Sequence, residues 1–463
     1  MITITVQNVD SRLSDYSSEL EEKLTVPYEN YWFSPRYKAG LWDGRHHFLK
    51  VPSLKFSTGL LHIVVEFFNE KNVLYEVIDQ RMLPKQFYSD DSLSALFDGS
   101  LLSDIVLRDY QIKSIESAIK KERGVLELPT GSGKTEIAAG LIKIMNQRTL
   151  FLVHTKDLLN QTVDRFKKRI GLSIGSIGEG RWDVENKNII VATVQSLNSK
   201  LTRDEKNTKK FLNSFIILFM DEVHHASAKS WSQICSLCKN AYYRYGLSGT
   251  ILRRDILSNM KMLAAFGEPI YRLPTMQLID EGYLSPIRVE IIRNEEAFKY
   301  GTWQEIYEKG VANSEARNKM IVEKVAMHWN EKKKIMILVR YIRHGENLQM
   351  MLRRDEIPAI FLQGISDREE RENVKKTFND KGDFVLIASP IFDEGVDIPE
   401  INILINAAAG ESEVKTIQKV GRGLRPKKDK STLIVYDFLD SSKYLRKHSL
   451  HRIKVYKKEG FLS

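Results

Sequence analysis

A glycine-rich loop between a buried strand and a helix constrains the fold of this chain more than any other feature. The loop, LPTGSGKT at residues 128–135, directly follows an apolar run that ends at residue 128. Glycines let backbone N–H groups approach phosphate oxygens, and the helix that follows points its N-terminus at them. The general pattern has glycine at position 128, where this chain has leucine. The loop predicts an ATP site on Gly131, Ser132, Gly133, Lys134 and Thr135, in which Lys134 contacts the phosphates and Thr135 binds Mg²⁺.

Short apolar segments alternate with helical stretches in two successive regions of the chain. Near-continuous apolar runs favour parallel strands that are buried on both faces, and the alternation is typical of doubly wound α/β sheets. The expected strands are 124–128, 149–154, 189–193, 216–220 and 245–247, then 335–339, 359–362, 384–389, 403–406 and 433–437. Residues 1–100 carry no nucleotide motif and predict a small α+β domain, with a strand at 60–68. We therefore expect domains at 1–100, 101–280 and 281–445, followed by a basic tail at 446–463.

An acidic pair follows the fourth expected strand. Asp221 and Glu222 come directly after the apolar residues 215–220, so they lie at the carboxyl edge of a parallel sheet, where such sheets bind ligands. We expect Asp221 to hold Mg²⁺ through water, and Glu222 to orient and deprotonate the attacking water. His224 is a poor metal ligand in this context, and we expect it to link the site to the second lobe.

Two further elements fit the same nucleotide. Gln111, close before the loop, has an amide that can read the adenine edge with two hydrogen bonds. Arg422 and Arg425 are three residues apart, which places them on one helix face, and guanidinium groups stabilise charge on a transferring phosphoryl group. Exposed basic side chains would be the alternative interpretation of this pair.

Composition narrows the class of partner. The formal net charge of +10 and the pI of about 9.2 favour a polyanion such as nucleic acid, although a merely basic protein has the same balance. No apolar stretch reaches the length of a membrane span, and the N-terminus lacks the layout of a signal peptide. We therefore expect no membrane partner and a cytoplasmic location. Cys235 and Cys238, the two cysteines, are too few for a structural zinc site, so we expect small buried residues.

Taken in order, these motifs resemble those of superfamily 2 helicases with a DExH-type second motif. The resemblance covers residues 105–440. Its segments are RDYQ at 108–111, GSGKT at 131–135, VHTKDLLNQ at 153–161, ATVQSL at 192–197, DEVH at 221–224, SGT at 248–250, LQGISDREER at 362–371, ASPIFDEGVDIP at 388–399 and QKVGRGLR at 418–425.

The resemblance implies two RecA-like lobes with ATP between them and nucleic acid across both. It implies an adenine motif at Arg108 and Gln111, and phosphate-backbone contacts from Thr155, Thr193 and Ser389. Ser248 and Thr250, together with His224, would couple hydrolysis to strand movement. Near the nucleotide, the resemblance places the following residues of the second lobe: Glu394, Gly395, Asp397 (by the ribose), Gln418 (by the γ-phosphate), and Arg422 and Arg425 as the arginine fingers.

The N-terminal segment YWFSPRY at 31–37 and GLWDGR at 40–45 resembles the front domain of phage UvsW-type recombination helicases, which remodel forks and Holliday junctions. Its aromatic residues can stack on bases while Arg36 and Arg45 neutralise phosphates. The alternative is that Trp32, Phe33 and Trp42 form the core of a small domain, with Asp43 and Gly44 in its hairpin turn. For the individual aromatic residues we favour the core interpretation.

These observations lead us to expect an ATP-dependent DNA helicase that acts on branched DNA, as a monomer. An RNA helicase of the same superfamily remains open, because the phosphate-binding motifs do not read the 2′-OH. An XPB-like or restriction-type double-strand translocase also shares much of the motif set. A DNA-structure binder with a vestigial ATPase is disfavoured by the intact site residues. A P-loop kinase or transport ATPase is disfavoured because it leaves the second set of motifs unexplained.

Overall fold

The computed structural model describes residues 1–82, 90–129, 131–249, 255–296, 298, 301–363, 368–389, 401–410 and 432–462. Contacts divide the chain into two units. Residues 1–128 and 133–273 form unit 1, and residues 129–132 and 274–463 form unit 2. Both units are mixed α/β, and each contains a large sheet of parallel strands. The expected fold class, two parallel-sheet lobes preceded by a small α+β domain, is confirmed.

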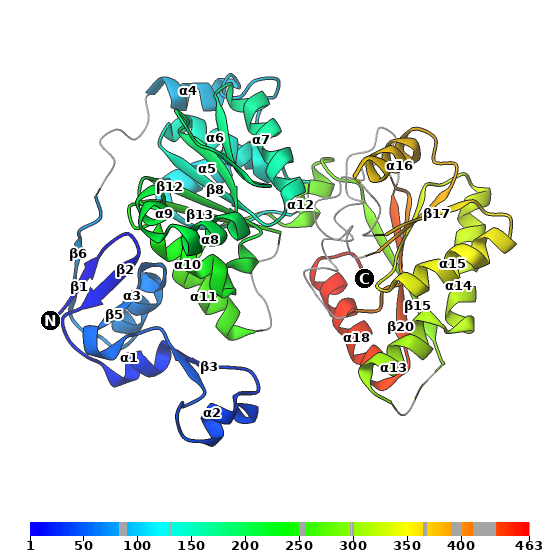
Figure 1. Cartoon of the computed structure of the whole chain (residues 1–463), viewed down its shortest axis with the longest axis horizontal. Helices are drawn as coiled ribbons and strands as arrows, with labels where there is room; N and C mark the ends of the chain where they lie inside the picture. The colour runs from blue at the N-terminus through cyan, green and yellow to red at the C-terminus, as the bar shows by residue number, and fades with distance from the viewer. Residues whose placement is uncertain are drawn as a thin grey trace. The chain divides into compact units, whose positions relative to one another are not determined.

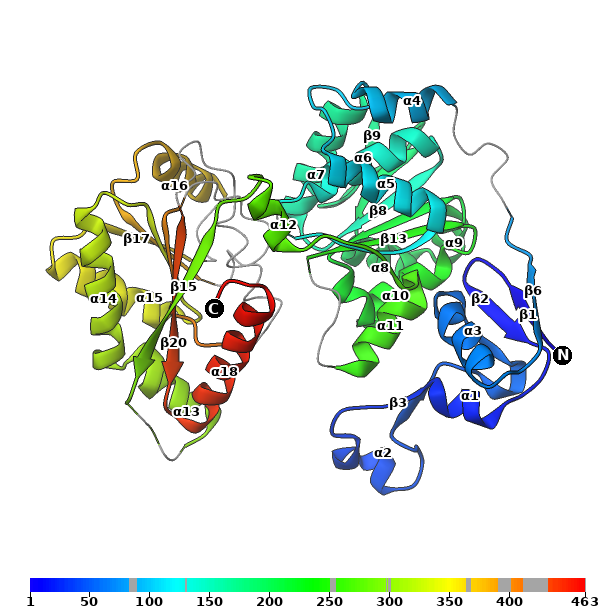
Figure 2. The ribbon, with the colours of Figure 1, turned by 180° about the vertical axis from the view of Figure 1, so that it is seen from behind.

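Unit 1 begins with a small domain built on a four-stranded sheet of order β5-β2-β1-β6, in which β1 and β6 run parallel. Its elements are β1 Ile2–Val6, β2 Asp10–Leu13, α1 Ser18–Lys23, β3 Thr25–Pro27, η1 Tyr31–Phe33, α2 Pro35–Lys38, β4 Arg45–His47, η2 Val51–Ser53, β5 Lys55–Ser57, η3 Thr58–Leu60, α3 Leu61–Glu70 and β6 Tyr75–Asp79. The excursion between β3 and β4 carries α2 away from the rest of the small domain (Figures 1 and 2).

The strand expected at residues 60–68 is wrong, because this segment forms helix α3. A long apolar run satisfies either periodicity, and tertiary packing decides between them. Val64, Phe67 and Phe68 are the helix residues that become buried, and their spacing of three and one places them on one helical face.

The small domain shares its core with helix α11 (Ile256–Phe266), which lies in the chain between the last two strands of the first large sheet. Leu257 and Met260 of α11 pack into the same apolar cluster as the buried residues of β1, β2 and α3. Gly59 fits at this junction only because it has no side chain, since a Cβ there would lie 2.0 Å from the Leu263 carbonyl oxygen. The small domain and the first sheet are thus packed as one unit.

The remainder of unit 1 is an eight-stranded sheet of order β10-β9-β11-β8-β12-β13-β7-β14. Its elements are α4 Asp90–Asp98, α5 Asp109–Lys121, β7 Arg123–Glu127, α6 Lys134–Met145, β8 Thr149–Val153, α7 Lys156–Ile170, β9 Ile174–Gly178, β10 Arg181–Asp183, β11 Ile189–Thr193, α8 Val194–Arg203, α9 Glu205–Leu212, β12 Ile217–Asp221, η4 Val223–Ser227, α10 Lys229–Leu237, β13 Tyr243–Ser248, α11 Ile256–Phe266 and β14 Pro269–Arg272. The described pairs are parallel except β9 with β10. Helices α8, α10 and α11 bury one face of this sheet, and its fully apolar strands explain why they were recognisable from sequence.

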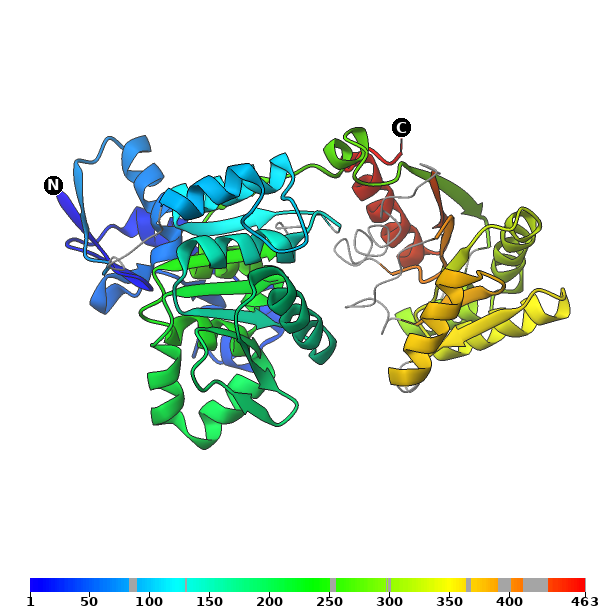
Figure 3. The same ribbon diagram turned by 90° about the horizontal axis from the view of Figure 1, so that it is seen from above.

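Unit 2 is a six-stranded sheet of order β15-β20-β19-β16-β18-β17, with parallel pairing throughout its described strands. Its elements are α12 Thr275–Asp280, β15 Ile287–Asn294, α13 Trp303–Tyr307, the π-helix η5 Glu308–Ala312, α14 Glu315–Asn330, β16 Ile335–Leu338, α15 Ile342–Arg354, β17 Ala359–Leu362, α16 Arg368–Asp380, β18 Val385–Ala388, β19 Ile403–Asn406, β20 Leu433–Asp440 and α18 Lys443–Lys458. Alternate residues along the strands pack against α14 and α15 on one face and against α16 and α18 on the other. Figure 3 shows the helices of unit 2 around its sheet.

The segment expected as a basic tail is part of this packing. It lies within and after α18, which carries a buried arginine, Arg452. The Arg452 Nε and Nη2 atoms donate to the Asp437 carboxylate at 2.9 Å, and the Tyr456 hydroxyl donates to the same carboxylate at 2.7 Å. Residues 446–458 of this segment therefore belong to helix α18 of unit 2, because one side of the helix covers the sheet.

Candidate functional site

The phosphate-binding loop is shaped by glycine conformations. Gly131 and Gly133 adopt left-handed backbone angles, with φ of +86° and +82°. Gly133 is the N-cap of α6, so the first N–H groups of that helix follow the loop directly. A Cβ at Gly133 would lie 2.3 Å from Gln111 Nε2, so a side chain there would displace the Gln111 amide, in addition to the strain of the positive φ. A helix N-terminus that emerges from such a turn is suited to binding an anion.

Lys134 and the acidic pair meet at the carboxyl edge of the first sheet. Asp221 ends β12, and its neighbour in register on β13 is Leu247, one residue before Ser248. The Lys134 Nζ atom lies 3.9 Å from Glu222 Oε1 and 3.4 Å from the Leu128 carbonyl oxygen. These separations are long for a charge-assisted hydrogen bond, so the ammonium group is held only weakly by these two groups, and a phosphate can replace them.

The two carboxyl groups differ strongly in proton affinity. Burial raises the pKa of Asp221, and the charge of Glu222 raises it further, to about 6. Burial also tends to raise the pKa of Glu222, but the charges of Lys134 and His224 have the larger effect and lower the pKa of that carboxyl to about 2. Glu222 is therefore an ionised acceptor at neutral pH. It also has a left-handed backbone with φ of 50°, a strained conformation for a side-chain-bearing residue that is concentrated at functional sites.

His224 connects the acidic pair to the end of the neighbouring strand. Its Nδ1 atom lies 3.2 Å from Glu222 Oε2 and 3.4 Å from Ser248 Oγ, and both His224 and Ser248 are buried. The structure thus brings Glu222 together with two of the three residues expected in coupling, His224 and Ser248. Thr250, the third, lies outside the described residues.

Gln111 lies beside the loop rather than on an open surface. It is 3% exposed, and its Oε1 atom accepts from the Arg108 N–H at 2.9 Å in the capping box of α5. Arg108 Nη1 donates to the Tyr110 hydroxyl at 2.9 Å. The first turn of α5 is therefore preorganised next to Gly133. The adenine contact remains a prediction.

A stack of rings next to the acidic pair was not expected from sequence. The His154 and His225 rings lie 4.3 Å apart and are inclined by 8°, and Trp231 stacks on His225 with centroids 5.8 Å apart. Gln195 Nε2 donates to the His154 carbonyl oxygen at 3.2 Å. The sequence contained a signal for this ring stack, because His154 and His225 follow the carboxyl ends of β8 and β12, which are adjacent strands.

The residues expected to contact a nucleic-acid backbone all lie at or just after the carboxyl end of a parallel strand. Thr155 is the N-cap of α7 and accepts from the Leu158 N–H at 3.3 Å. Thr193 precedes α8 and its hydroxyl donates to Ser196 Oγ at 2.9 Å. Ser389, buried in unit 2, directly follows β18. Their contact with nucleic acid remains a prediction.

The remaining residues expected from the second lobe cannot be placed. Glu394, Gly395, Asp397, Gln418, Arg422 and Arg425 all lie outside the described residues. Their part in the nucleotide site therefore stays an expectation of the sequence.

The aromatic loop, which we define as residues 28–44, differs from the expected small core. Trp32 is 50% exposed and Phe33 is 68% exposed, and neither η1 nor α2 contains a buried residue. The prediction that these aromatic residues form a core is therefore wrong for both, because the domain core is made by β1, β2, α1 and α3 instead. Trp42 is half-buried and packs edge-on against Tyr28, with centroids 5.2 Å apart.

The two arginines expected to bind nucleic acid differ in environment. Arg36 is exposed on α2. Arg45, at the base of the aromatic loop, donates from Nη1 to both carboxylate oxygens of Glu22, at 2.9 and 3.0 Å. Of the two, Arg36 is the more accessible cation.

Two other features of the described residues bear on the expectations. Cys235 and Cys238 are free and buried, as predicted. Within the described part of the chain, no helix combines the length and the apolar character needed to cross a bilayer.

Comparison with known proteins agrees with this geometry. Residues 104–253 match the family described as type III restriction enzyme, res subunit, and residues 316–427 match the helicase conserved C-terminal domain. The chain is 27% identical over 484 residues to the ATP-dependent DNA helicase UvsW of Enterobacteria phage T4, covering 96% of this chain and 94% of UvsW. It is 28% identical over 399 residues to the DNA 3'-5' translocase XPB2 of Sulfurisphaera tokodaii, covering 78% of this chain and 88% of XPB2.

A solved structure supports the fold. A Saccharomyces cerevisiae Dbp5 variant bound to RNA and ADP BeF3 has a TM-score of 0.55 at 14% identity, covering 81% of this chain and 93% of Dbp5. The two matched domains, with UvsW similar along nearly the whole length, identify the chain as an ATP-hydrolysing superfamily 2 helicase that resembles UvsW.

Proposed function

We propose that the chain is an ATP-driven DNA helicase and translocase that remodels branched DNA, such as forks and Holliday junctions, as a monomer. The observation that carries the branched-DNA part is the exposure of the aromatic loop. The small domain leaves Trp32 and Phe33 in solvent, and Tyr37 is 37% exposed and Leu41 73% exposed. Exposed apolar surface of this kind is typical of a binding site. Exposed aromatic rings stack on unpaired bases whatever their sequence.

The charges of the aromatic loop fit the same partner. Arg36 and Lys38 are exposed on α2, next to these rings. Cations beside a stacking surface neutralise the phosphates of the bases that stack. At a branch point, bases are unstacked at lower cost than within a duplex, so a stacking surface favours the branch over plain duplex.

The described residues support a division of labour at the ATP site. Mg-ATP, when bound, supplies the phosphoanhydride bond whose hydrolysis drives movement. We propose that Lys134 places positive charge against the phosphates, that Thr135 and Asp221 hold Mg²⁺, and that Glu222 accepts the proton of the attacking water. Within the described part of the chain, no three histidine, cysteine or acidic side chains cluster as a metal site, and Mg²⁺ commonly takes few protein ligands besides phosphate oxygens.

The contacts around Ser248 support the coupling part of the proposal. His224 bridges Glu222 and Ser248, so a change at the acidic pair displaces a side chain at the end of β13. We propose that this displacement reaches Thr155 and Thr193, which hold the strand. Arg422 and Arg425 complete the site as fingers in this proposal.

A second candidate function has a specific observation in its favour. XPB2, a DNA translocase by name, is similar over 78% of this chain. A translocase that tracks plain duplex without preference for a branch is therefore the main competitor. An RNA substrate is the other competitor, because threonine and serine hydroxyls that hold phosphates do not read the sugar.

One panel of substrates tests the proposal. ATP-dependent conversion is measured on matched forks, flaps, four-way junctions, tailed duplexes and plain duplexes, and ATPase stimulation is compared between DNA and RNA of the same sequence. We expect the junction and the fork to be converted faster than the tailed duplex. Equal conversion of the tailed duplex and the four-way junction would remove the branch preference, and stimulation by RNA alone would remove DNA as the substrate.

A double variant links the panel to the aromatic loop. Trp32→Ala with Phe33→Ala removes two exposed rings, and base stacking is worth about 1–3 kcal/mol per ring. We expect weaker binding of junctions by at least about tenfold, with ATPase in the absence of DNA unchanged. Tyr16→Ala removes a ring that is 50% exposed elsewhere in the same domain and is the matched control.

A further inference from the structure

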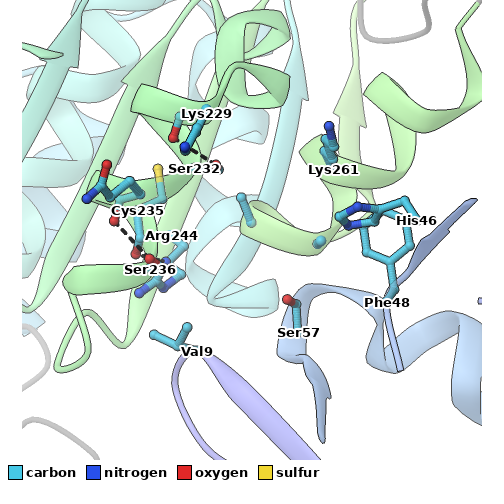
Figure 4. A pocket seen from close by; sticks show the side chains of 13 residues that line it. Val9, His46, Phe48, Ser57, Lys229, Ser232, Cys235, Ser236, Arg244 and Lys261 are labelled. Carbon is cyan, nitrogen blue, oxygen red and sulfur yellow. Dashed lines mark hydrogen bonds between the residues drawn. The ribbon is translucent and has the colours of Figure 1, made fainter. Parts of the chain in front are cut away.

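A second hollow of unit 1 lies away from the nucleotide site, between the small domain and helices α10 and α11. Its volume is about 390 Å³, which is within the usual range for small-molecule sites. Figure 4 shows Lys229 and Ser232 of α10 on one side of it, Lys261 and His46 on another, and Ser57 of the small domain below. The wall thus comes from parts of the chain that are far apart in sequence.

The lining of the hollow is cationic. Lys229, Lys261 and Arg244 all line it, and no carboxylate of the described residues does. The His46 imidazole also lines it, but burial lowers the pKa of this group, so at neutral pH it adds no positive charge. Arg244 is 1% exposed, and its donors go to the carbonyl oxygens of Ala241, Cys235 and Cys238, at 3.1, 3.1 and 2.6 Å. Three of the five N–H groups of a guanidinium are occupied in this way. Burial lowers the pKa of Arg244, and the charge of Asp10 is the nearby acidic influence that opposes this.

A second buried arginine adds to this charge. Arg123 is the neighbour of Arg244 in register on β7, and it too donates to carbonyl oxygens, those of Asn8, Ala265 and Phe266. Neither guanidinium has a carboxylate within 4 Å among the described residues. Because carbonyl dipoles alone hold the two guanidinium groups, part of the free-energy cost of burying their charges is not compensated. An anion in the adjacent hollow would offset this cost.

The remaining lining suits a ligand with both an anionic and an apolar part. Lys229 and Ser232, at positions i and i+3 of α10, are joined by Gln233 and Ser236 along the same helical face. The hydroxyl groups of Ser232 and Ser236 donate to the carbonyl oxygens of Lys229 and Gln233, at 3.1 and 2.8 Å, so the ammonium group of Lys229 and the amide of Gln233 are the donors of this face that a ligand can use. Phe48 provides an apolar and aromatic surface on the side of the small domain, and His46 packs edge-on against it with ring centroids 4.4 Å apart.

We propose that this pocket binds the phosphate of a nucleotide-sized ligand, with the phosphate against Lys229, Lys261 and Arg244 and the apolar part against Phe48. The phosphate comes either from a free nucleotide or from the end of a DNA strand. The site is distinct from the ATP site, because Arg244 is the second residue of the strand β13 and Ser248 is its last. It does not depend on the proposed action on branched DNA.

Binding is measured by calorimetry in a Lys134→Ala background, so that the phosphate-binding loop does not dominate. The probes are inorganic phosphate, thymidine 5′-monophosphate, and a tetranucleotide with and without a 5′-phosphate. Lys229→Glu reverses one exposed charge at the pocket. Lys206→Glu makes the same change on α9, outside the lining, and Lys229→Arg keeps the charge.

We expect thymidine 5′-monophosphate to bind saturably, with a Kd raised about tenfold or more by Lys229→Glu. Lys206→Glu and Lys229→Arg should leave the Kd unchanged, and Lys229→Glu should leave ATPase without DNA unchanged in the otherwise wild-type chain. Preference for the phosphorylated tetranucleotide over its unphosphorylated twin assigns the phosphate to a strand end, and binding of the mononucleotide alone assigns it to a free nucleotide. Equal affinity in the Lys229→Glu and Lys206→Glu variants, or no binding of any probe in the Lys134→Ala background, overturns the proposal.

Discussion

The two ends of the first large sheet use charge in opposite ways. At the carboxyl end, Lys134 and Glu222 are partly exposed and lie 3.9 Å apart, with the lysine held only loosely. At the amino end, Arg244 is fully enclosed and is fixed by three backbone carbonyl groups. The same strand, β13, joins the two ends, since it begins next to Arg244 and finishes at Ser248.

The difference teaches which charges serve chemistry and which serve structure. A side chain that must exchange partners during a reaction is held by weak contacts, because strong ones would have to be broken in each cycle. A side chain that fixes the backbone makes hydrogen bonds that are costly to lose once they are buried. Substitutions at the carboxyl end should therefore change activity, and those at the amino end should change stability.

The largest effect is expected at the carboxyl end. Lys134→Ala removes the charge for the phosphates, and Glu222→Gln removes the proton acceptor, which is worth about 10²–10⁴-fold in rate. We expect DNA-stimulated ATPase to fall by at least that factor in each variant, while Tm stays close to that of the wild type. Glu205→Gln, an exposed position on α9, is the control. Retained turnover in both variants would show that the site has been assigned to the wrong residues.

The next effect is expected at the amino end. Arg244→Met removes a donor from three buried carbonyl groups, of which that of Cys238 keeps the N–H of Ala241, and this should lower the free energy of unfolding by about 3 kcal/mol. Chemical denaturation measures this, with Arg203→Met on the exposed side of α8 as the control. ATPase per folded molecule should be nearly unchanged. A large loss of turnover with intact stability would reverse the comparison between the two ends.

The rate of thiol labelling is a second measurement on the Arg244→Met variant. Burial raises the pKa of Cys235 to about 11 and that of Cys238 to about 12. Both thiols are therefore neutral and unreactive in the native protein at pH 8, because the thiolate is the nucleophile. Loss of the guanidinium frees the carbonyl groups of both cysteines, so we expect faster labelling in the variant than in the wild type. Unchanged labelling would show that Arg244 does not fix this segment.

The smallest effect is expected in the ring stack at the carboxyl end. His225→Ala removes a ring that contacts both His154 and Trp231, and an aromatic contact of this kind is worth about 0.5–1.5 kcal/mol. We expect stimulation of ATPase by DNA to fall several-fold, with ATPase in the absence of DNA retained. His225→Phe keeps a ring in place and should restore most of the stimulation. If both activities fall together, the ring acts in hydrolysis itself and not in coupling.

The strands of the two large sheets and the phosphate-binding loop could be predicted from the sequence for a clear physical reason. Strands buried on both faces are continuously apolar, and the expected strand at 189–193 has the same bounds as β11. The same criterion failed at residues 60–68, where a run of apolar residues forms α3 and only the partner surface decides the period. Contacts such as that of Gly59 with α11 are invisible in sequence, because they join residues about two hundred positions apart.

The sequence predicted which residues form the candidate site, but not how strongly these residues interact. Motif order placed Asp221, Glu222 and His224 near Lys134, yet the separation of their proton affinities follows from burial and distance, which only the fold supplies. The exposure of Trp32 and Phe33 was missed for the same reason, since aromatic residues usually provide a core.

The aromatic loop has a consequence for how such proteins diversify. Its two ends are already joined by the ladder between β3 and β4, closed by the Tyr28 N–H, which donates to the Gly44 carbonyl oxygen at 2.9 Å. The segment between them adds little to the buried core, so its length and side chains are free to vary without unfolding the domain. If the loop contacts DNA as proposed, changes in its length and side chains would alter the substrate preference and leave the ATP site unchanged.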